Sequence, residues 1–138
     1  MLSRVDAFAA QGVTLKDPAH SWSGVREDGA VVIAILEADV HAHAGGFSCL
    51  LWAPPHAEPS DVAWQERRIQ SERREHCRIA AMRGSAKVLL VRGADAVVED
   101  DFVLEARVEN QRGEFWALWG DTADEPRVAR ARRQARAA

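Results

Sequence analysis

The chain has no tyrosine, only two cysteines and no long apolar run. Cys49 and Cys77 are too few for a disulfide framework, so we expect reduced thiols and a cytoplasmic protein. No stretch approaches the roughly 18 apolar residues that a membrane-spanning helix needs. The first residues include an acid, Asp6, and lack an apolar segment, which argues against a signal peptide. We therefore expect no membrane partner.

A basic excess, the usual mark of a nucleic-acid-binding chain, is also missing, because 18 Lys and Arg face 21 Asp and Glu and the net charge is −3. The charges are nevertheless unevenly spread. Residues 127–138 carry five arginines and no acid, and residues 62–83 hold six arginines against three glutamates. Nucleic acid or a nucleotide therefore stays among the candidate partners, bound through these two basic segments.

The length of 138 residues fits one domain, and 47% hydrophobic with 28% charged residues is typical of a folded chain. We expect a single α+β domain over 1–125 and a basic, flexible tail over 126–138. Ser3, followed by Asp6, predicts an N-capped helix over 3–10. The segment 62–83 has no glycine or proline, so it predicts the one long helix.

Six segments have the apolar or alternating pattern of strands. They are 21–26, 30–36, 47–53, 86–91, 102–108 and 114–119. Residues 38–46 are predicted to form a loop. Because hairpins join most of these segments and a single helix interrupts them, the pattern favours a curved mixed sheet or small barrel with one long packed helix and a short N-terminal helix.

Two ionisable residues interrupt the face of the 62–83 helix that should pack on the sheet. Glu72 and His76 lie one turn apart, on the face that also carries Ile69. Burying such groups is costly unless they are paired. Two interpretations remain open. Glu72 and His76, or Glu72 and Arg73, form a structural pair, or all three line a cleft between helix and sheet.

Trp22 stands at the entry to the first long strand, among polar residues that include Lys16 and Ser23. An indole stacks on flat ligands, and a neighbouring hydroxyl can hydrogen-bond to their edges. This arrangement favours a ligand site at Trp22. The alternative, which also stays open, is a core tryptophan flanked by two strand serines.

Other kinds of site find less support. His41 and His43 have a spacing at which two histidines can share a metal ion, but no glutamate follows them in a ligand pattern, so we predict no metal site. Cys49 and Cys77 lack a nucleophile signature and are interpreted as small buried hydrophobic residues. No glycine-rich phosphate loop is present. We therefore assign no cofactor and no catalytic residue.

Four motifs occur along residues 12–119 in a recognisable order. They are Leu15-Lys16, Ser21-Trp22-Ser23, an apolar strand, and Glu72-Arg73 with His76. In this order they resemble a family of small uncharacterised bacterial proteins, in which an "LxN…WSW" segment precedes a strand and an "ER…H" helix follows. The arrangement is also similar to the PUA-like folds (EVE, ASCH and SRA), small barrels that often read modified bases or nucleotides.

The chain departs from that family pattern at several positions. Asp17 stands where the pattern has Asn, His20 stands where it has the first Trp, and Leu36 stands where it has a later Trp. A charged strand ending is replaced by Arg92-Gly93-Ala94-Asp95. If the Asn and Trp form a site in the family, part of that site is missing in this chain.

The leading interpretation is a PUA-like binding module that reads a modified base or a nucleotide-like ligand. The candidate ligand-binding residues are Lys16, Trp22, Ser23, Glu72, Arg73 and His76. One alternative is a hydrolase acting on nucleic acid with Glu72 and His76 as its acid–base pair. Another is a regulatory interaction protein whose basic tail binds a partner. The sequence does not decide among them, nor does it set the oligomeric state.

Overall fold

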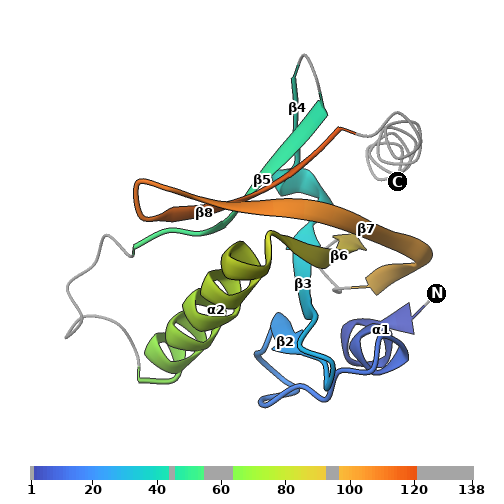
Figure 1. Ribbon diagram of the computed structural model, residues 1–138. Helices are drawn as coiled ribbons and strands as arrows, with labels where there is room; N and C mark the ends of the chain where they lie inside the picture. Colours follow the sequence, from blue (N-terminus) through green and yellow to red (C-terminus); the bar gives the residue numbers. More distant parts are fainter. Residues whose placement is uncertain (1, 44–45, 55–63, 93–96, 121–138) are drawn as a thin grey trace.

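The computed structural model describes residues 2–43, 46–54, 64–92 and 97–120 (Figure 1). Its elements, in chain order, are β1 (Leu2–Ser3), α1 (Arg4–Ala10), β2 (Ser23–Val25), β3 (Val31–Leu36), the 3-10 turn η1 (Glu37–Asp39), β4 (His41–His43), β5 (Gly46–Trp52), α2 (Trp64–Arg83), β6 (Ser85–Arg92), β7 (Val97–Gln111) and β8 (Glu114–Trp119). The six predicted strands are all present, and the predicted α+β class is confirmed. The predicted tail and the residues just before α2 lie outside the described ranges.

The strands form one mixed sheet in the order β2-β3-β6-β7-β8-β5-β4, and β1 pairs with β7. β3 and β6 run parallel, whereas the other pairs among the described strands are antiparallel. Register shifts at Leu89/Val91 and at Leu50/Trp52 bend the sheet. In the described residues the sheet does not close, because β2 and β4 are its two end strands.

Local sequence signals explain several boundaries. The Ser3 hydroxyl accepts a hydrogen bond from the backbone N–H of Asp6 at 3.2 Å and caps α1 as predicted. The turn between β7 and β8 places Arg112 and Gly113 at φ 56° and 88°, a left-handed conformation that glycine adopts without strain. Gly84, at φ 91°, ends α2.

The predicted loop over 38–46 is wrong in its central part, where His41–His43 forms β4 and pairs with Gly46–Ser48 of β5. His41 and Ala42 are exposed, so this strand is held by its backbone ladder rather than by apolar side chains. A strand of this kind has no hydrophobic pattern, which is why the sequence did not indicate it.

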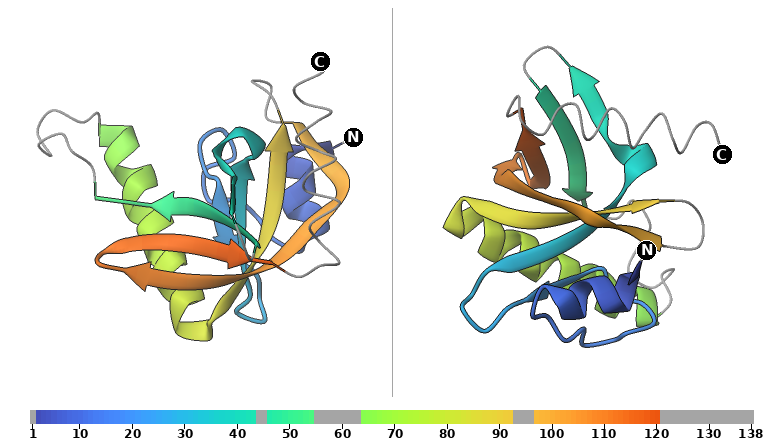
Figure 2. Two further views of the ribbon diagram at one scale, coloured as in Figure 1. Left: turned by 90° about the horizontal axis from the view of Figure 1, so that it is seen from above. Right: turned by 90° about the vertical axis from the view of Figure 1, so that its right-hand side faces the viewer.

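Two hydrophobic clusters lie on opposite faces of β3. Val31, Ile33 and Ile35 join the larger cluster, which packs between α2 and the sheet. Val32 and Ala34 join the smaller cluster, which includes Ala7 and Phe8 of α1. Figure 2 shows α1 and α2 on different sides of β3. β3 is therefore buried on both faces, which accounts for its unbroken apolar run.

Within the described ranges, neither helix combines the length and the apolar character that crossing a bilayer requires.

Candidate functional site

Two strand edges face each other across a gap in the sheet, which we call the seam. In the described part of the chain, β2 pairs with β3 only as far as Ile33, so residues 34–36 have one edge without a strand partner. β4 pairs with β5 only over Gly46–Ser48, which leaves residues 50–52 with a similar free edge. Residues of both free edges line a common hollow. The backbone groups along the seam therefore need partners other than strands.

Arg73 of α2 supplies partners across the seam. Its Nε donates to the carbonyl oxygen of Leu51 in β5 at 3.0 Å. Its Nη1 and Nη2 donate to the carbonyl oxygens of Trp22, at 2.7 Å, and of Ala34 in β3, at 3.1 Å. One planar guanidinium thus ties α2 to three separate chain segments with three of its five N–H donors. Burial lowers the pKa of Arg73, but an arginine stays charged at neutral pH.

Two adjoining hollows lie along the seam and share the residues Trp22, Leu50, Leu51 and Arg73. The first hollow measures about 340 Å³ and is further lined by Ser23, Trp52, Ala53, Ile69, Gln70 and Glu72. The second measures about 270 Å³ and is further lined by Ala34, Ile35, Leu36, Asp39 and Cys49. The first hollow has the size of a small-ligand pocket and combines aromatic, apolar and polar walls.

Ser23 and His76 form a hydrogen bond of 2.7 Å between the serine Oγ and the imidazole Nδ1. Ser23 is only 1% exposed, whereas His76 is half-buried. Burial lowers the pKa of His76, and Arg73 acts in the same direction, whereas Glu72 raises that pKa. The imidazole is therefore held largely neutral near pH 7.

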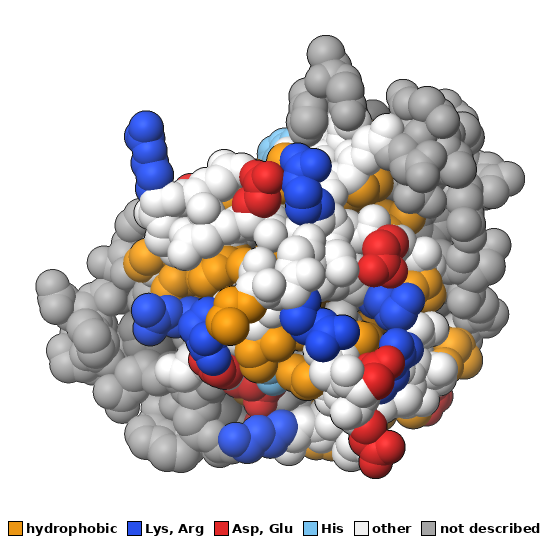
Figure 3. Space-filling model, in the orientation of Figure 1, with side chains coloured by type: hydrophobic (Ala, Val, Ile, Leu, Met, Phe, Trp, Pro, Cys, Tyr) orange, Lys and Arg blue, Asp and Glu red, His pale blue; other side chains and the backbone are white. Residues whose placement is uncertain are grey.

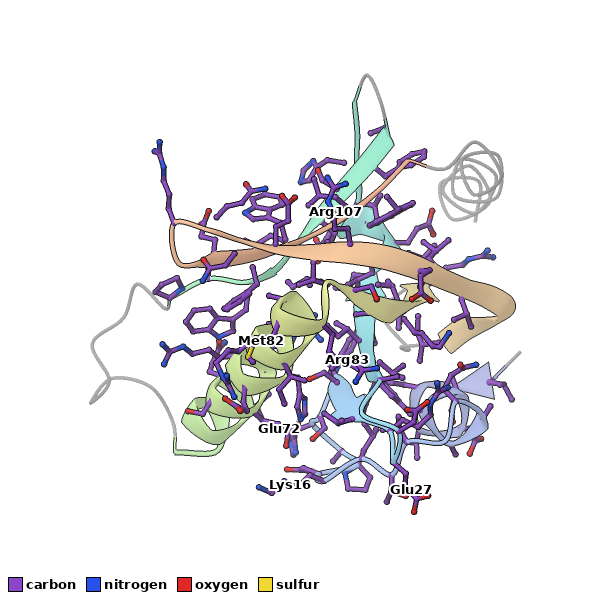
Figure 4. The ribbon with its side chains drawn as sticks, in the orientation of Figure 1. Lys16, Glu27, Glu72, Met82, Arg83 and Arg107 are labelled. Atoms are coloured by element: carbon purple, nitrogen blue, oxygen red, sulfur yellow. The ribbon has the colours of Figure 1, made fainter. Side chains whose placement is uncertain are left out.

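Glu72 lines the first hollow and is half-buried. Among the described residues it forms no hydrogen bond or ion pair, because Arg73 bonds to backbone carbonyls and His76 bonds to Ser23. Figure 4 places Glu72 and Lys16 on the same side of the molecule, and both act on the pKa of His76, which Lys16 lowers. The lining of the first hollow carries charges of both signs, from Glu72 and Arg73.

Trp22 packs against the smaller hydrophobic cluster and Trp52 against the larger one, and each indole also has an arginine over it. The Arg4 guanidinium lies 5.4 Å from the ring centroid of Trp22, and that of Arg74 lies 5.6 Å from the ring of Trp52. Arg4 also donates to the carbonyl oxygens of Pro18 and Ser21, next to Trp22 in the chain. These contacts limit the motion of both rings, so the aromatic walls are preformed.

The exposed side of α2 is basic, but some of its charge is neutralised. Figure 3 shows Lys and Arg side chains scattered among hydrophobic ones on the face that carries this helix. Arg78 pairs with Glu75 at 2.6 Å, whereas Arg74 lies over Trp52. Arg83 approaches Gly29 in the turn between β2 and β3. The helix thus offers anions a modest positive surface.

The two cysteines are free and buried, as expected for small hydrophobic residues. Burial raises the pKa of the Cys49 thiol to about 12 and that of Cys77 to about 11. At neutral pH both are protonated and unreactive. In the described part of the chain, no group of three His, Cys, Asp or Glu side chains is arranged to hold a metal ion.

The structure brings most of the predicted site residues together. Trp22, Ser23, Glu72 and Arg73 line the first hollow. The predicted residue His76 does not line this hollow but is bonded to Ser23, which does, and Lys16 is exposed on the segment before β2. Their roles in ligand binding stay predictions.

Sequence reasoning missed Trp52 and Gln70 of the first hollow, and the bonding role of Arg73. Trp52 ends a strand segment and gave no sign of facing α2. The signal for Arg73 was its spacing, because it stands four residues after Ile69 and four before the buried Cys77 on the core-facing side of the helix. An arginine at that position must find acceptors inside the fold.

Comparison with protein-family models, with curated proteins and with solved structures gave no match for this chain.

Proposed function

We propose that the protein is a binding module that takes a flat, nucleobase-like ligand, free or within a nucleic acid, in the first hollow. The observation that carries this proposal is the composition of the hollow, in which Trp22 and Trp52 lie with Glu72, Gln70 and Ser23 around a space of about 340 Å³. Aromatic walls favour a flat ring, and a few polar groups read its edge.

The rigidity of the walls supports the same proposal. Each indole has an arginine over it, and Arg73 holds Trp22 in place through its carbonyl oxygen. A ligand therefore loses little free energy in ordering the site. Stacking of one base on an aromatic ring contributes about 1–3 kcal/mol.

A PUA-like architecture belongs to this proposal as well. The bent mixed sheet with one long helix against it supports the assignment, as do the motifs around Trp22 and Glu72. A base extruded from a duplex would occupy the hollow, with Lys16, the α2 arginines and the basic tail near phosphates. A base within a nucleic acid and a free nucleotide present the same ring to the site.

The test measures binding by isothermal titration calorimetry. The ligands are the nucleoside 5′-monophosphates and short oligonucleotides with and without modified bases. Trp22→Leu should weaken binding at least tenfold, since a stacking wall is lost, whereas Trp22→Phe should retain part of it. Trp116→Leu is the matched control, because Trp116 is half-buried on β8 and lines neither hollow.

Unchanged affinity in Trp22→Leu, with a normal thermal transition, would contradict the proposal. Binding of oligonucleotides but not of mononucleotides would identify nucleic acid as the source of the ligand.

A second candidate, a hydrolase acting on nucleic acid through Glu72 and His76, has one observation in its favour. The lowered pKa of His76 keeps the imidazole neutral and able to accept a proton. Against it, Nδ1 is already bonded to Ser23, and Ser23 is closed to solvent. We therefore place binding ahead of hydrolysis. Cleavage of a fluorogenic oligonucleotide that is lost in His76→Asn would reverse this order.

A further inference from the structure

Among the described residues, Glu72 is the one carboxylate that lines the first hollow. In the part of the chain that the structure describes, its neighbours on α2 are engaged elsewhere, Arg73 with three carbonyls and Glu75 with Arg78. Glu72 itself is half-buried and makes no hydrogen bond or ion pair among the described residues. A partly desolvated carboxylate without donors gains free energy from any ligand that supplies them.

An ionised carboxylate only accepts hydrogen bonds, and its two oxygens match a ligand with two adjacent N–H donors. Trp22 and Trp52 in the lining favour donors that belong to a flat ring system. We propose that Glu72 selects a guanine-type base, whose ring N–H and neighbouring amino group bond to the two carboxylate oxygens. This inference rests on the proposed function and names the class of base that the hollow takes.

Other bases fit Glu72 less well. Adenine and cytosine present an amino group beside a ring nitrogen that has a lone pair, so one carboxylate oxygen would face another acceptor. Uracil and thymine offer a single ring N–H between two carbonyl oxygens. Each of these edges leaves a carboxylate oxygen repelled or unbonded, which lowers affinity because that oxygen is desolvated without compensation.

A guanidinium also has two adjacent donors, but the charges around the hollow disfavour a cation. Arg4 and Arg74 already lie over the two indoles, and the Arg73 guanidinium is a further lining charge. Lys16 is near enough to lower the pKa of His76. A neutral base with a phosphate meets attraction at this rim, whereas a cationic side chain meets repulsion.

The experiment compares guanosine and inosine 5′-monophosphates by calorimetry. They have the same charge and the same ring N–H, and they differ in the 2-amino group. We expect inosine monophosphate to bind about tenfold to a hundredfold more weakly to the unaltered chain. In Glu72→Gln the two ligands should bind within about threefold of each other, because the carboxamide presents an N–H toward one donor.

Glu75→Gln is the matched control, since Glu75 is exposed on the same helix and pairs with Arg78. It should keep the full preference for guanosine monophosphate. Thermal melting of both variants identifies any loss of folding.

Equal binding of the two nucleotides to the unaltered chain, or an unchanged preference in Glu72→Gln, would overturn the assignment of Glu72 and leave the hollow as a base site. Tighter binding of acetyl-arginine amide than of guanosine monophosphate would also overturn it, in favour of a peptide cation. Absence of binding by every nucleotide and oligonucleotide tested would overturn the proposed function itself, and this inference with it.

Discussion

Two regions of the sheet satisfy the hydrogen-bonding groups of their backbone in different ways. Along β6, β7 and β8 the ladders are long and antiparallel, and each strand bonds to its neighbours directly. At the seam, β3 and β5 present carbonyl oxygens to one side chain, that of Arg73. The first arrangement leaves no space between strands, whereas the second leaves two hollows.

The difference shows how an open sheet can hold a site. A ladder is satisfied by backbone alone and fixes neighbouring strands about 4.8 Å apart. An arginine side chain reaches further than a backbone hydrogen bond, so its guanidinium can span a wider gap between strands while it still bonds to three carbonyl oxygens. The molecule thereby keeps a cavity beside buried backbone without leaving those acceptors unbonded.

Of the substitutions at the seam, replacement of Arg73 should lower the free energy of unfolding most. Arg73→Ala removes a donor from three carbonyl oxygens, of which, within the described residues, only that of Trp22 keeps a second one, the Ala34 N–H, so we expect a loss of about 3–5 kcal/mol in the free energy of unfolding. Denaturant titration followed by tryptophan fluorescence measures it. Arg73→Lys should recover less than half of the loss, because an ammonium lacks the planar fork that reaches three acceptors.

Arg74→Ala is the control for Arg73→Ala, since Arg74 is the next residue on α2 and is exposed. It should cost less than about 1 kcal/mol, as exposed charges contribute little. Equal losses in the two alanine variants would show that the seam does not depend on the guanidinium.

Loss of the Ser23–His76 hydrogen bond should have the next largest effect on the free energy of unfolding. Ser23→Ala leaves the imidazole Nδ1 without its partner, at a cost of about 1–2 kcal/mol. A double-mutant cycle should find coupling between positions 23 and 76. The cycle between positions 72 and 76 should give a smaller coupling, because Glu72 acts on His76 through charge and not through a hydrogen bond. A larger coupling energy between positions 72 and 76 would support the alternative in which Glu72 and His76 form a structural pair.

The same histidine predicts a pH dependence. Burial lowers the pKa of His76 from the usual 6.5, so between the two values the unfolded chain binds more protons than the folded chain. Stability from this group is complete above about pH 6.5 and is lost as the pH falls toward the folded-state pKa. Unfolding titrations at pH 7.5 and 5.5 should show a smaller loss in His76→Asn than in the unaltered chain. Parallel losses would exclude His76 as the titrating group.

Replacement of Arg4 tests whether the burial of an arginine affects stability as much as the number of hydrogen bonds that the arginine makes. Like Arg73, Arg4 bonds to three carbonyl oxygens, those of Pro18, Ala19 and Ser21, but its contacts lie at or near the surface. Arg4→Ala should therefore cost only about 1 kcal/mol in denaturant titration. A loss as large as that of Arg73→Ala would mean that the bond count, and not burial, sets the effect.

The smallest effect on stability is expected from the tail. Residues 127–138 carry five arginines and few large apolar side chains, so deleting them should leave the melting temperature nearly unchanged. Any binding to DNA or RNA should weaken, most clearly at low salt. This deletion also tests the interaction-protein alternative, and a large drop in melting temperature would assign the tail to the core.

The fold was predictable where local chemistry decides the conformation. Ser3 and Asp6 predicted α1, and the alternation of 114–119 matches β8 residue for residue. The first third of β7, residues 97–101, was not predicted, because it includes the acidic run Glu99-Asp100-Asp101. That segment is a strand because β6 and β1 pair with its backbone, and such pairing leaves little trace in residue types.

Some residues of the candidate site were predictable from the sequence, but their partners were not. Helical periodicity placed Glu72, Arg73 and His76 toward the sheet, and the structure agrees. Periodicity says nothing about what lies opposite, however, so the bond from His76 to Ser23 and the bonds from Arg73 to backbone could not be foreseen. Both depend on contacts between segments far apart in the sequence.

The three acceptors of Arg73 have a consequence for the order of folding. Trp22, Ala34 and Leu51 belong to different segments, and α2 follows all of them along the chain. The hairpins β2–β3 and β7–β8 can form from local contacts, whereas the guanidinium finds its acceptors only after the strands and the helix have met. We expect bonds that form this late to be absent from the transition state. Replacing Arg73 should then speed unfolding more than it slows folding, so that this residue governs how long the native protein lasts more than how quickly it forms.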